Sequence, residues 1–281
     1  MKYRFILRKL ALLICILLFF LPGCKKSEVV KELPPIPVDS TPSISTILLP
    51  VTTSVATGVN GYYISMPSNY NQSTEKYPVL IYIPGAGQFG NGSFDLPLLL
   101  KAGPAELADE QRLPATFKVN NKTFSLLVFT PQFNGAPGIS IINDCIEFVK
   151  THYRVDSTRI YLSGLSMGSV AACDLAAALP GKLAAIVPMA GVSYDYSTSD
   201  KCQKIAENNL PVWAFHSEDD PQINVEIAKG FTNKINSFNT HVPAKLTLWT
   251  DGGHDAWTRA IEPLYKENGM NIYEWMLQYH R

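Results

Sequence analysis

The chain contains a glycine-x-serine-x-glycine motif whose serine could act as a nucleophile, in the stretch 164–168 (GLSMG). The apolar run 159–163 precedes the motif directly, and the small residues 169–172 follow it. This order predicts a strand, a sharp turn and a helix, with the Ser166 hydroxyl raised above the edge of a sheet. Only glycine fits beside so tight a turn. Because glycine and serine are common, the flanking strand and helix support this prediction more than the motif alone does.

A serine hydroxyl needs a base within hydrogen-bonding distance, and the base needs a partner that orients it. His254 follows the last predicted strand, in the stretch 250–257 (TDGGHDAW). The two glycines before it would let this loop turn back over the sheet edge, so we expect His254 to be the base. The remaining histidines lie at positions typical of surface or packing residues: His152, His216, His241 and His280.

The orienting acid is expected in the loop after the preceding strand, because the partners at such sites follow in the order serine, acid, histidine. This loop contains three carboxylates in a row, Glu218, Asp219 and Asp220. Any one of them could orient the histidine, and the others would then be ordinary loop residues. Spacing alone does not choose among them.

An acyl-transfer site also needs two backbone N–H groups that bind the oxygen on which negative charge develops. We expect one from Met167, the residue after the serine. The second is expected from the glycine-rich stretch 83–92 (IPGAGQFGNG), and each such donor typically contributes about 3 kcal/mol. Glycine-rich loops can also bind phosphate. This one lacks the lysine of a P-loop and the acidic residue of a dinucleotide-binding fold, so no nucleotide site is indicated.

From about Tyr62 to its end, the chain resembles the α/β-hydrolase superfamily. More narrowly, it is similar to secreted esterases that include family 1 carbohydrate esterases, polyhydroxybutyrate depolymerase-like esterases and predicted peptidases related to prolyl oligopeptidase. The matching stretches are 78–92, 130–132, 153–168, 215–225 and 253–257. The resemblance implies that the acid is Asp220, with Asp219 as the alternative. It also implies that the loop donor is Ala86, with Gly87 as the alternate.

The sequence departs from these relatives at three positions. Pro84 stands where a histidine usually precedes the loop glycine, Ser217 follows the histidine of the acid loop in place of glycine, and Ser169 replaces the second glycine after the turn. The first departure bears on the geometry of the loop rather than on the chemistry.

The resemblance implies acyl transfer without a cofactor. Ser166 would attack an ester carbonyl, His254 would take its proton, and the acid would hold the imidazole in place. We therefore expect a carboxylester hydrolase acting on carbohydrate-linked or phenolic esters of the feruloyl or acetyl type. Two alternatives stay open: a serine peptidase or other acyl hydrolase with the same machinery, and a catalytically silent binding lipoprotein.

The sequence indicates fewer residues for substrate binding than for catalysis. The segment 191–211, of about 20 residues, connects two predicted strands. It leaves no room for a large lid, which favours a bulky or polymeric substrate. Tyr194, Tyr196 and Trp257 could form an aromatic wall for a sugar or phenolic ring. Ordinary packing is the alternative for all three.

Strand and helix patterns alternate along residues 43–281, which we take as one catalytic domain. Strands are expected around 62–66, 79–83, 124–129, 159–163, 183–189, 212–215 and 245–249, and helices around 139–153, 169–179, 225–238 and 272–279. Such alternation predicts an α/β-hydrolase fold, with a mostly parallel sheet of the eight-stranded type and helices on both faces. Ligands of such sheets bind beyond the carboxyl ends of the strands, where every candidate residue above falls.

The first 42 residues have the composition of a targeting segment and a tether. Four basic residues precede the apolar run Leu10 to Leu21, and Leu21-Pro22-Gly23-Cys24 resembles a bacterial lipobox. Residues 1–23 are therefore expected to be a lipoprotein signal peptide, with Cys24 lipidated and 24–42 as a flexible tether. This predicts a membrane-anchored protein of the bacterial cell envelope, with ordinary secretion as the alternative.

Charge and cysteine content exclude several other classes. The chain has 24 Lys and Arg against 24 Asp and Glu, and loss of the four basic residues in 1–23 would leave 20 against 24. No basic stripe points to nucleic acid. The three cysteines outside the first 24 residues imply no disulfide framework, and no Cys and His cluster has the spacing of a metal site: Cys145, Cys173 and Cys202.

Overall fold

The computed structural model describes residues 45–281. The expectations for the signal peptide, Cys24 and the tether lie outside these residues. Within the described part of the chain, no helix is both long and apolar enough to cross a membrane.

One eight-stranded sheet forms the centre of the fold, in the order β1-β2-β6-β3-β7-β8-β9-β10. Its first two strands pair antiparallel, β2 pairs antiparallel with β6, and every later pairing is parallel. The strands are β1 (Thr46–Ala56), β2 (Val59–Pro67), β3 (Tyr77–Ile83), β6 (Leu127–Phe133), β7 (Val155–Leu165), β8 (Ala185–Met189), β9 (Trp213–Ser217) and β10 (Lys245–Trp249). The prediction of a mostly parallel sheet of this type is confirmed.

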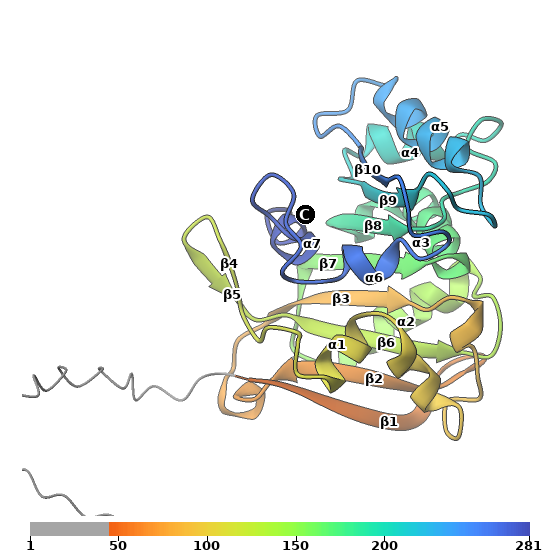
Figure 1. Ribbon diagram of the computed structural model, residues 1–281. Helices are drawn as coiled ribbons and strands as arrows, with labels where there is room; N and C mark the ends of the chain where they lie inside the picture. Colours follow the sequence, from red (N-terminus) through yellow and green to blue (C-terminus); the bar gives the residue numbers. More distant parts are fainter. Residues whose placement is uncertain (1–44) are drawn as a thin grey trace, which may run out of the picture. The chain divides into compact units, whose positions relative to one another are not determined.

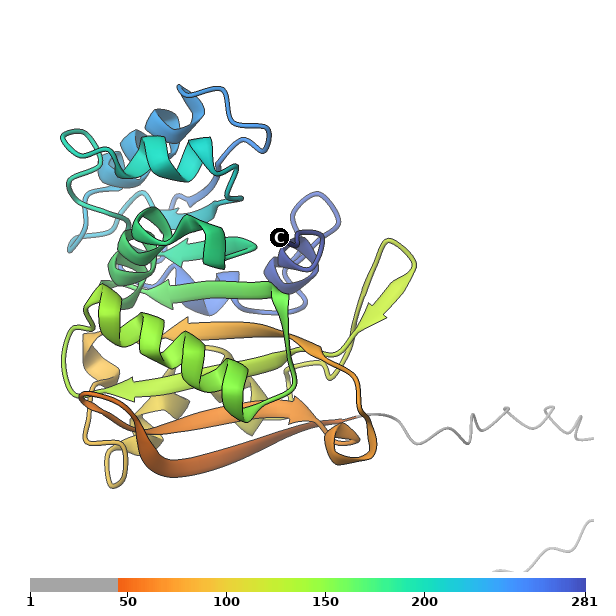
Figure 2. The same cartoon turned by 180° about the vertical axis from the view of Figure 1, so that it is seen from behind.

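Helices cover both faces of this sheet, as Figures 1 and 2 show from opposite sides. Successive side chains of a strand point to opposite faces. In β3, Val79 and Ile81 therefore join the core on one face, and Leu80 and Tyr82 join the core on the other. The first core is closed by α2 (Ile139–His152), α3 (Met167–Ala178), α4 (Lys201–Glu207) and α5 (Val225–Asn236), and the second by α1 (Pro104–Asp109), α6 (Trp257–Ala260) and α7 (Ile272–Met276).

Two neighbouring central strands, β3 and β6, are buried over their whole length. All seven residues of β3 and all seven of β6 are buried, as expected for strands covered on both faces. The predicted stripe of α2 is also buried through Ile142, Ile146 and Val149. These apolar patterns identified β3 and α2 from the sequence.

The predicted strand 124–129 is wrong in its bounds. Phe124 ends a separate hairpin of β4 (Phe117–Val119) and β5 (Lys122–Phe124), and β6 begins only at Leu127. Only Ser125 interrupts the apolar residues of 124–129, so periodicity did not place the break there. Four short 3-10 helices complete the described elements: η1 (Tyr70–Gln72), η2 (Ala86–Gln88), η3 (Leu96–Lys101) and η4 (Pro180–Lys182).

The three cysteines of the described chain are free and buried. Burial is the main cause that raises the pKa of the Cys145 thiol to about 12 and that of the Cys202 thiol to about 11. Thiols in such surroundings stay protonated and are poor nucleophiles. The chemistry must therefore come from other side chains.

Candidate active site

Ser166 occupies a strained turn between β7 and α3. Its φ of 51° and ψ of −119° lie outside the regions that a residue with a side chain normally adopts. The neighbouring strand β8 holds this turn, because the Ser166 N–H donates to the carbonyl of Met189 at 2.9 Å. Residues kept in such a conformation are often found at functional sites.

The two glycines of the motif are required by close backbone contacts. A Cβ atom at Gly164 would lie 2.7 Å from the carbonyl group of Gly168. A Cβ atom at Gly168 would lie 2.3 Å from the carbonyl oxygen of Ile83, at the end of β3. The start of α3 is thus pressed against both neighbouring strands, and the serine is displayed beyond their carboxyl ends.

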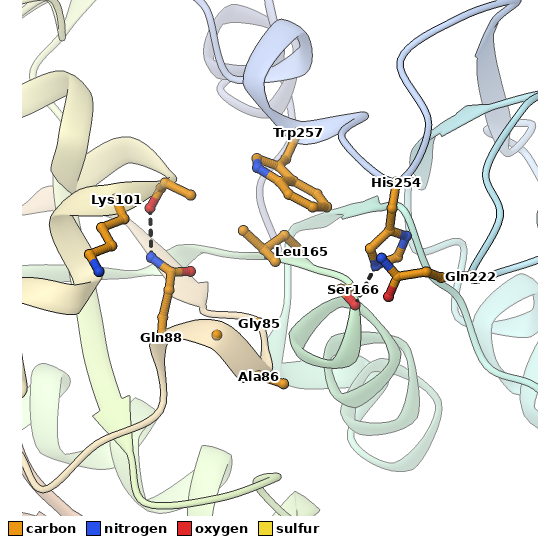
Figure 3. Close-up of a pocket in the computed structure, with 11 residues that line it drawn as sticks. Gly85, Ala86, Gln88, Lys101, Leu165, Ser166, Gln222, His254 and Trp257 are labelled. Atoms are coloured by element: carbon orange, nitrogen blue, oxygen red, sulfur yellow. Dashed lines mark hydrogen bonds between the residues drawn. The ribbon is translucent and has the colours of Figure 1, made fainter.

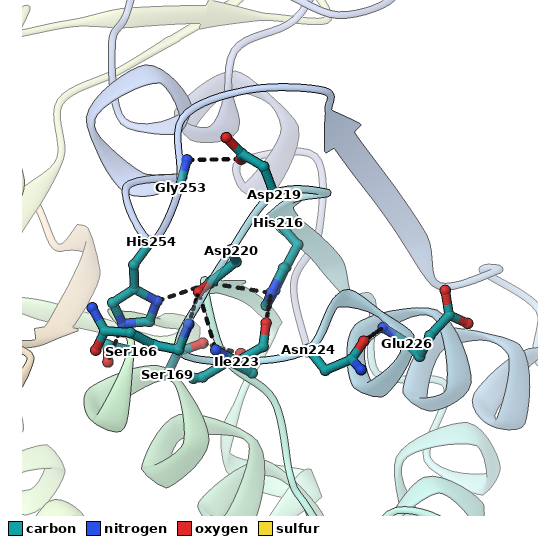
Figure 4. A network of polar contacts seen from close by, with 12 residues as sticks. Ser166, Ser169, His216, Asp219, Asp220, Ile223, Asn224, Glu226, Gly253 and His254 are labelled. Carbon is teal, nitrogen blue, oxygen red and sulfur yellow. Dashed lines mark hydrogen bonds and ion pairs between the residues drawn. The ribbon is translucent and has the colours of Figure 1, made fainter.

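His254 is brought over the sheet edge by the loop between β10 and α6. Gly252 and Gly253 adopt φ values of 121° and 57°, in the left-handed region that favours glycine. The imidazole Nε2 lies 2.8 Å from Ser166 Oγ, and Nδ1 lies 2.8 Å from Asp220 Oδ2. Figure 4 shows the three side chains in line.

The Asp220 carboxylate is fully buried and well supplied with donors. Its Oδ1 accepts the backbone N–H groups of Gln222 at 2.8 Å and Ile223 at 3.0 Å. Burial has the largest single effect on this carboxyl and favours its neutral form. The hydrogen bonds from His254 and the two backbone N–H groups outweigh it, so the pKa of Asp220 lies below its ordinary value.

The other two carboxylates of this loop are exposed and do not touch the imidazole. Asp219 Oδ1 accepts the backbone N–H of Gly253 at 2.8 Å, so this side chain ties the acid loop to the histidine loop. The backbone N–H of Glu218 donates a hydrogen bond to the carbonyl oxygen of Trp249 at the end of β10. Of the three candidates left open by spacing, the structure therefore brings only Asp220 to His254.

The backbone donors predicted for the oxyanion lie at helix starts. Met167 is the first residue of α3, and Ala86 is the first residue of η2. N–H groups in a first helical turn have no acceptor within the helix, so they are free to bind a ligand. Gly85 packs the loop against the turn, because a Cβ atom there would lie 2.2 Å from Leu165. Pro84 therefore does not prevent close docking of this loop.

A pocket of about 320 Å³ opens beside Ser166 and is shown in Figure 3. Its lining comprises Gly85, Ala86, Gly87, Gln88, Lys101, Ala102, Leu165, Ser166, Gln222, His254 and Trp257. Trp257 stands edge-on to His254, with ring centroids 5.5 Å apart. The alternate donor Gly87 also lines this pocket, and a Cβ atom there would meet open space.

The predicted aromatic wall is smaller than expected. Tyr194 is 56% exposed and is not part of the lining, and Tyr196 packs against Gly230 of α5 instead. The loop that carries both tyrosines is fixed elsewhere, because Lys201 binds the carboxylates of Asp174 and Asp195. Of the three predicted aromatic residues, only Trp257 faces the pocket.

Residues 113–268, more than half of the chain, match the Phospholipase/Carboxylesterase family. This protein belongs to that family. A curated relative is a bifunctional acetylxylan esterase/xylanase from Neocallimastix patriciarum, 26% identical over 122 residues that make up 43% of this chain and 17% of the relative. The chain thus spans less than a fifth of the curated relative's length.

Solved structures of esterases share the fold of this carboxylesterase-family protein. A thermostable esterase superposes with a TM-score of 0.60 and 20% identity over 84% of this chain and 64% of its own. A ferulic acid esterase superposes with a TM-score of 0.54 and 15% identity over 77% of this chain and 93% of its own. These likenesses establish the α/β-hydrolase fold.

Two polar residues of the site were missed by sequence reasoning. His216 was interpreted as a packing residue, yet its Nε2 lies 3.3 Å from Asp220 Oδ2. Gln88 was passed over as part of a glycine-rich stretch, yet it is buried and lines the pocket. The position of His216, four residues before the acid, was the available signal for one of them. Among residues 45–281, no three His, Cys, Asp or Glu side chains are grouped as a metal site would require.

Proposed function

We propose that this protein is a carboxylester hydrolase in which Ser166, His254 and Asp220 form the catalytic triad. The observation that carries the proposal is the continuous hydrogen-bonded line from Ser166 Oγ through both ring nitrogens of His254 to Asp220, with 2.8 Å at each step. A serine with a base and an oriented acid is the arrangement that nucleophilic acyl transfer needs.

In the acylation step, Ser166 attacks the ester carbonyl while His254 Nε2 takes the hydroxyl proton. The lowered pKa of Asp220 keeps its carboxylate ionised at neutral pH, so it stabilises the imidazolium that forms. The N–H groups of Met167 and Ala86, with Gly87 as the alternate, bind the oxyanion. His254 then returns its proton to the leaving alcohol.

In the deacylation step, a water molecule enters beside His254, which removes a proton from it as it attacks the acyl-enzyme. The tetrahedral intermediate collapses, the acid is released and Ser166 recovers its proton. No cofactor takes part in either step, since the nucleophile, the base and the oxyanion donors all belong to the protein.

The proposed substrates are carbohydrate-linked or phenolic esters. The pocket beside Ser166 is mostly apolar and bears the ring of Trp257, a surface suited to an aromatic or sugar ring. Its volume of about 320 Å³ exceeds what an acetyl group alone would fill. The names of two similar proteins, an acetylxylan esterase/xylanase and a ferulic acid esterase, point the same way.

We also propose that the enzyme is held at the bacterial envelope by lipid on Cys24, as the lipobox-like sequence indicates. A substrate outside the cytoplasm would suit that location. Metabolic labelling with palmitate tests this point, and labelling that persists in Cys24→Ser would contradict it.

The central test compares the full-length protein with Ser166→Ala and His254→Ala on p-nitrophenyl acetate, methyl ferulate, acetylated xylan and a chromogenic peptide. We expect ester turnover that falls by several orders of magnitude in both variants. Near-native ester turnover by Ser166→Ala would refute the triad. Peptide cleavage with weak ester turnover would favour a peptidase. A folded protein that neither turns over substrate nor reacts at Ser166 with a fluorophosphonate would be a binding protein.

A further inference from the structure

Charged residues are unevenly divided between the two edges of the sheet. Strands β1, β3 and β6 to β10 run in one direction, so they begin at one edge, the amino edge, and end at the other, the carboxyl edge, where Ser166 lies. In Figure 1 the arrows of β3 and β7 point toward the carboxyl edge. Eight acidic residues and one basic residue lie between these strands and the α-helices that follow them: Asp95, Asp195, Asp200, Glu218, Asp219, Asp220, Asp251, Asp255 and Lys101.

The amino edge has the opposite balance. Six basic residues and two acidic residues lie in the segments that lead from an α-helix, or from β2, into the next of these strands: Lys76, Arg112, Lys118, Lys122, Arg154, Lys182, Glu75 and Glu110. Acidic residues at helix starts and basic residues at helix ends complement the helix dipoles, which accounts for part of this pattern. The lysines of the β4–β5 hairpin need another explanation, because they lie on a two-stranded ribbon.

This hairpin projects from the amino edge, as Figures 1 and 2 show. Its turn residues Asn120 and Asn121 have φ values of 48° and 63°, the left-handed conformation of a tight two-residue turn. Its base is held in place because Phe117 stacks on Tyr273, with ring centroids 5.0 Å apart. The hairpin is therefore a projection whose base is packed into the fold.

Lys118 and Lys122 are free donors on this projection. Both are exposed, and neither forms an ion pair or a side-chain hydrogen bond within residues 45–281. Val119 and Lys122 lie opposite each other in the hairpin, and so do Lys118 and Thr123, so one lysine stands on each face of the ribbon. An ammonium group can only donate hydrogen bonds, so the hairpin offers two contacts to anionic groups.

The preceding part of the chain joins the domain at the same edge. Ser45 is the first described residue, and its carbonyl oxygen accepts the N–H of Ser68 at 2.8 Å. Beside it, Thr46 Oγ1 donates to the carbonyl oxygen of Leu113 at 2.9 Å, shortly before β4. A chain from Cys24 to Ser45 spans at most about 70 Å, more than the width of such a domain, about 45 Å. An anchor at Cys24 would therefore not fix which edge faces the membrane.

We propose that the amino edge binds the anionic phospholipid surface of the membrane, with Lys118 and Lys122 as its contact point, and so turns Ser166 outward. An anionic surface attracts these lysines and repels the acidic carboxyl edge, so both edges favour the same orientation. The pocket beside Ser166 then opens away from the lipid, where a polymeric ester can reach it. This inference goes beyond the proposed function and takes from it only the anchor at Cys24.

Lysine acetylation on vesicles tests this orientation with the full-length protein. The vesicles contain phosphatidylcholine alone or an equimolar mixture with phosphatidylglycerol, flotation isolates the bound protein, and mass spectrometry gives the acetylation rate of each lysine. On anionic vesicles we expect Lys118 and Lys122 to react at least about fivefold more slowly than in free protein, while Lys101 at the carboxyl edge keeps its rate. In about 1 M NaCl, where the Debye length is about 3 Å, the difference should disappear. Equal protection of both edges, or no binding to anionic vesicles, would overturn the proposal.

A double variant and a control of equal charge locate the contact. Lys76, an exposed lysine before β3 at the amino edge, should be protected in the wild type and react freely when Lys118→Gln and Lys122→Gln are combined. Lys204→Gln combined with Lys229→Gln, on α4 and α5, changes the net charge by the same amount and should leave Lys76 protected. Protection of Lys76 that persists in the hairpin variant would place the contact elsewhere and overturn the proposal.

A soluble polyanion separates a lipid partner from an acidic polysaccharide. Polygalacturonate at the same charge concentration should protect Lys118 and Lys122 less than vesicles do, because only at a vesicle does the anchor hold the hairpin near the surface. Equal protection by both would make the partner a polysaccharide, and the membrane proposal would fall.

The orientation and the esterase fail separately. Both lysine double variants should turn over p-nitrophenyl acetate at the wild-type rate, since the lysines lie outside the pocket. If Ser166→Ala keeps near-native turnover while the hairpin stays protected on anionic vesicles, the triad is refuted and the orientation stands. If turnover depends on Ser166 but the two edges are acetylated alike, the esterase stands and the orientation falls.

Discussion

His216 Nε2 lies 3.3 Å from Asp220 Oδ2, the same carboxylate oxygen that lies 2.8 Å from His254 Nδ1. Figure 4 shows the two imidazoles on either side of this carboxylate. His216 is fully buried, and its Nε2 also lies 2.9 Å from the carbonyl oxygen of Ile223. Because two acceptors face Nε2, this nitrogen carries the ring proton. His216 therefore holds both the acid and the loop that follows it.

Removing this support should misplace the acid without removing it. We expect His216→Leu to lower kcat by about 10- to 100-fold with little change in KM, since small misplacements of catalytic groups cost rates of that order. His216→Gln keeps an N–H donor at a similar reach and should recover part of the loss. Steady-state kinetics on a p-nitrophenyl ester measures both. Equal losses in the two variants, with equal melting temperatures, would contradict a positioning role.

The adjacent aspartates should respond very differently to the same change. Asp220→Asn should lower kcat by about 10⁴-fold, because an amide no longer enforces the required imidazole tautomer. Asp219→Asn should cost less than tenfold, since Asp219 contacts only the backbone of Gly253. The two exchanges are matched in chemistry and position, so each serves as the control for the other. A larger loss in Asp219→Asn would move the acid by one residue.

Asp220 should also make stability depend on pH. Its pKa in the folded protein lies below that of an unfolded aspartate, about 3.9. Ionised Asp220 therefore stabilises the fold above about pH 4, and this contribution disappears as the pH falls through the lower folded-state pKa. Urea unfolding at pH 7, 5 and 3 should show wild type and Asp220→Asn differing most at pH 7 and least at pH 3. A constant difference would mean that this carboxylate contributes through packing alone.

Local sequence patterns were sufficient to predict the core of the sheet and the residues of the glycine-x-serine-x-glycine motif. Strands buried on both faces require runs of apolar residues, and tight turns require glycine, so both can be recognised from the sequence. Local patterns did not predict the role of residues whose contacts lie far away in the sequence. Tyr196 was a candidate for the aromatic wall, with ordinary packing as the alternative, and it packs against Gly230 in a loop whose Asp195 binds Lys201. His216 and Gln88 acquire their roles from partners on other elements. A short break in a mostly apolar segment, such as residues 125–126 between β5 and β6, leaves little periodic signal either.

The loop that carries Ala86 should depend on a buried glutamine of β6. Gln132 is fully buried, and its Nε2 donates to the carbonyl oxygens of Gln88 at 3.1 Å and Asp95 at 2.6 Å. Its Oε1 accepts the N–H of Gly92 at 2.8 Å. One side chain thus binds this loop at three points.

Gln132→Leu has nearly the same volume but leaves two buried backbone groups, the carbonyl of Gln88 and the N–H of Gly92, without their partner, each at a cost of about 1–3 kcal/mol. We expect a lower melting temperature, faster amide exchange confined to residues 84–103, and a kcat reduced by at least tenfold because the oxyanion donor is no longer held in place. Gln203→Leu, at an exposed position on α4, is the matched control and should change none of the three. If Gln132→Leu lowered stability while kcat and exchange in the loop stayed at wild-type values, Gln132 would support the core and not the oxyanion donor.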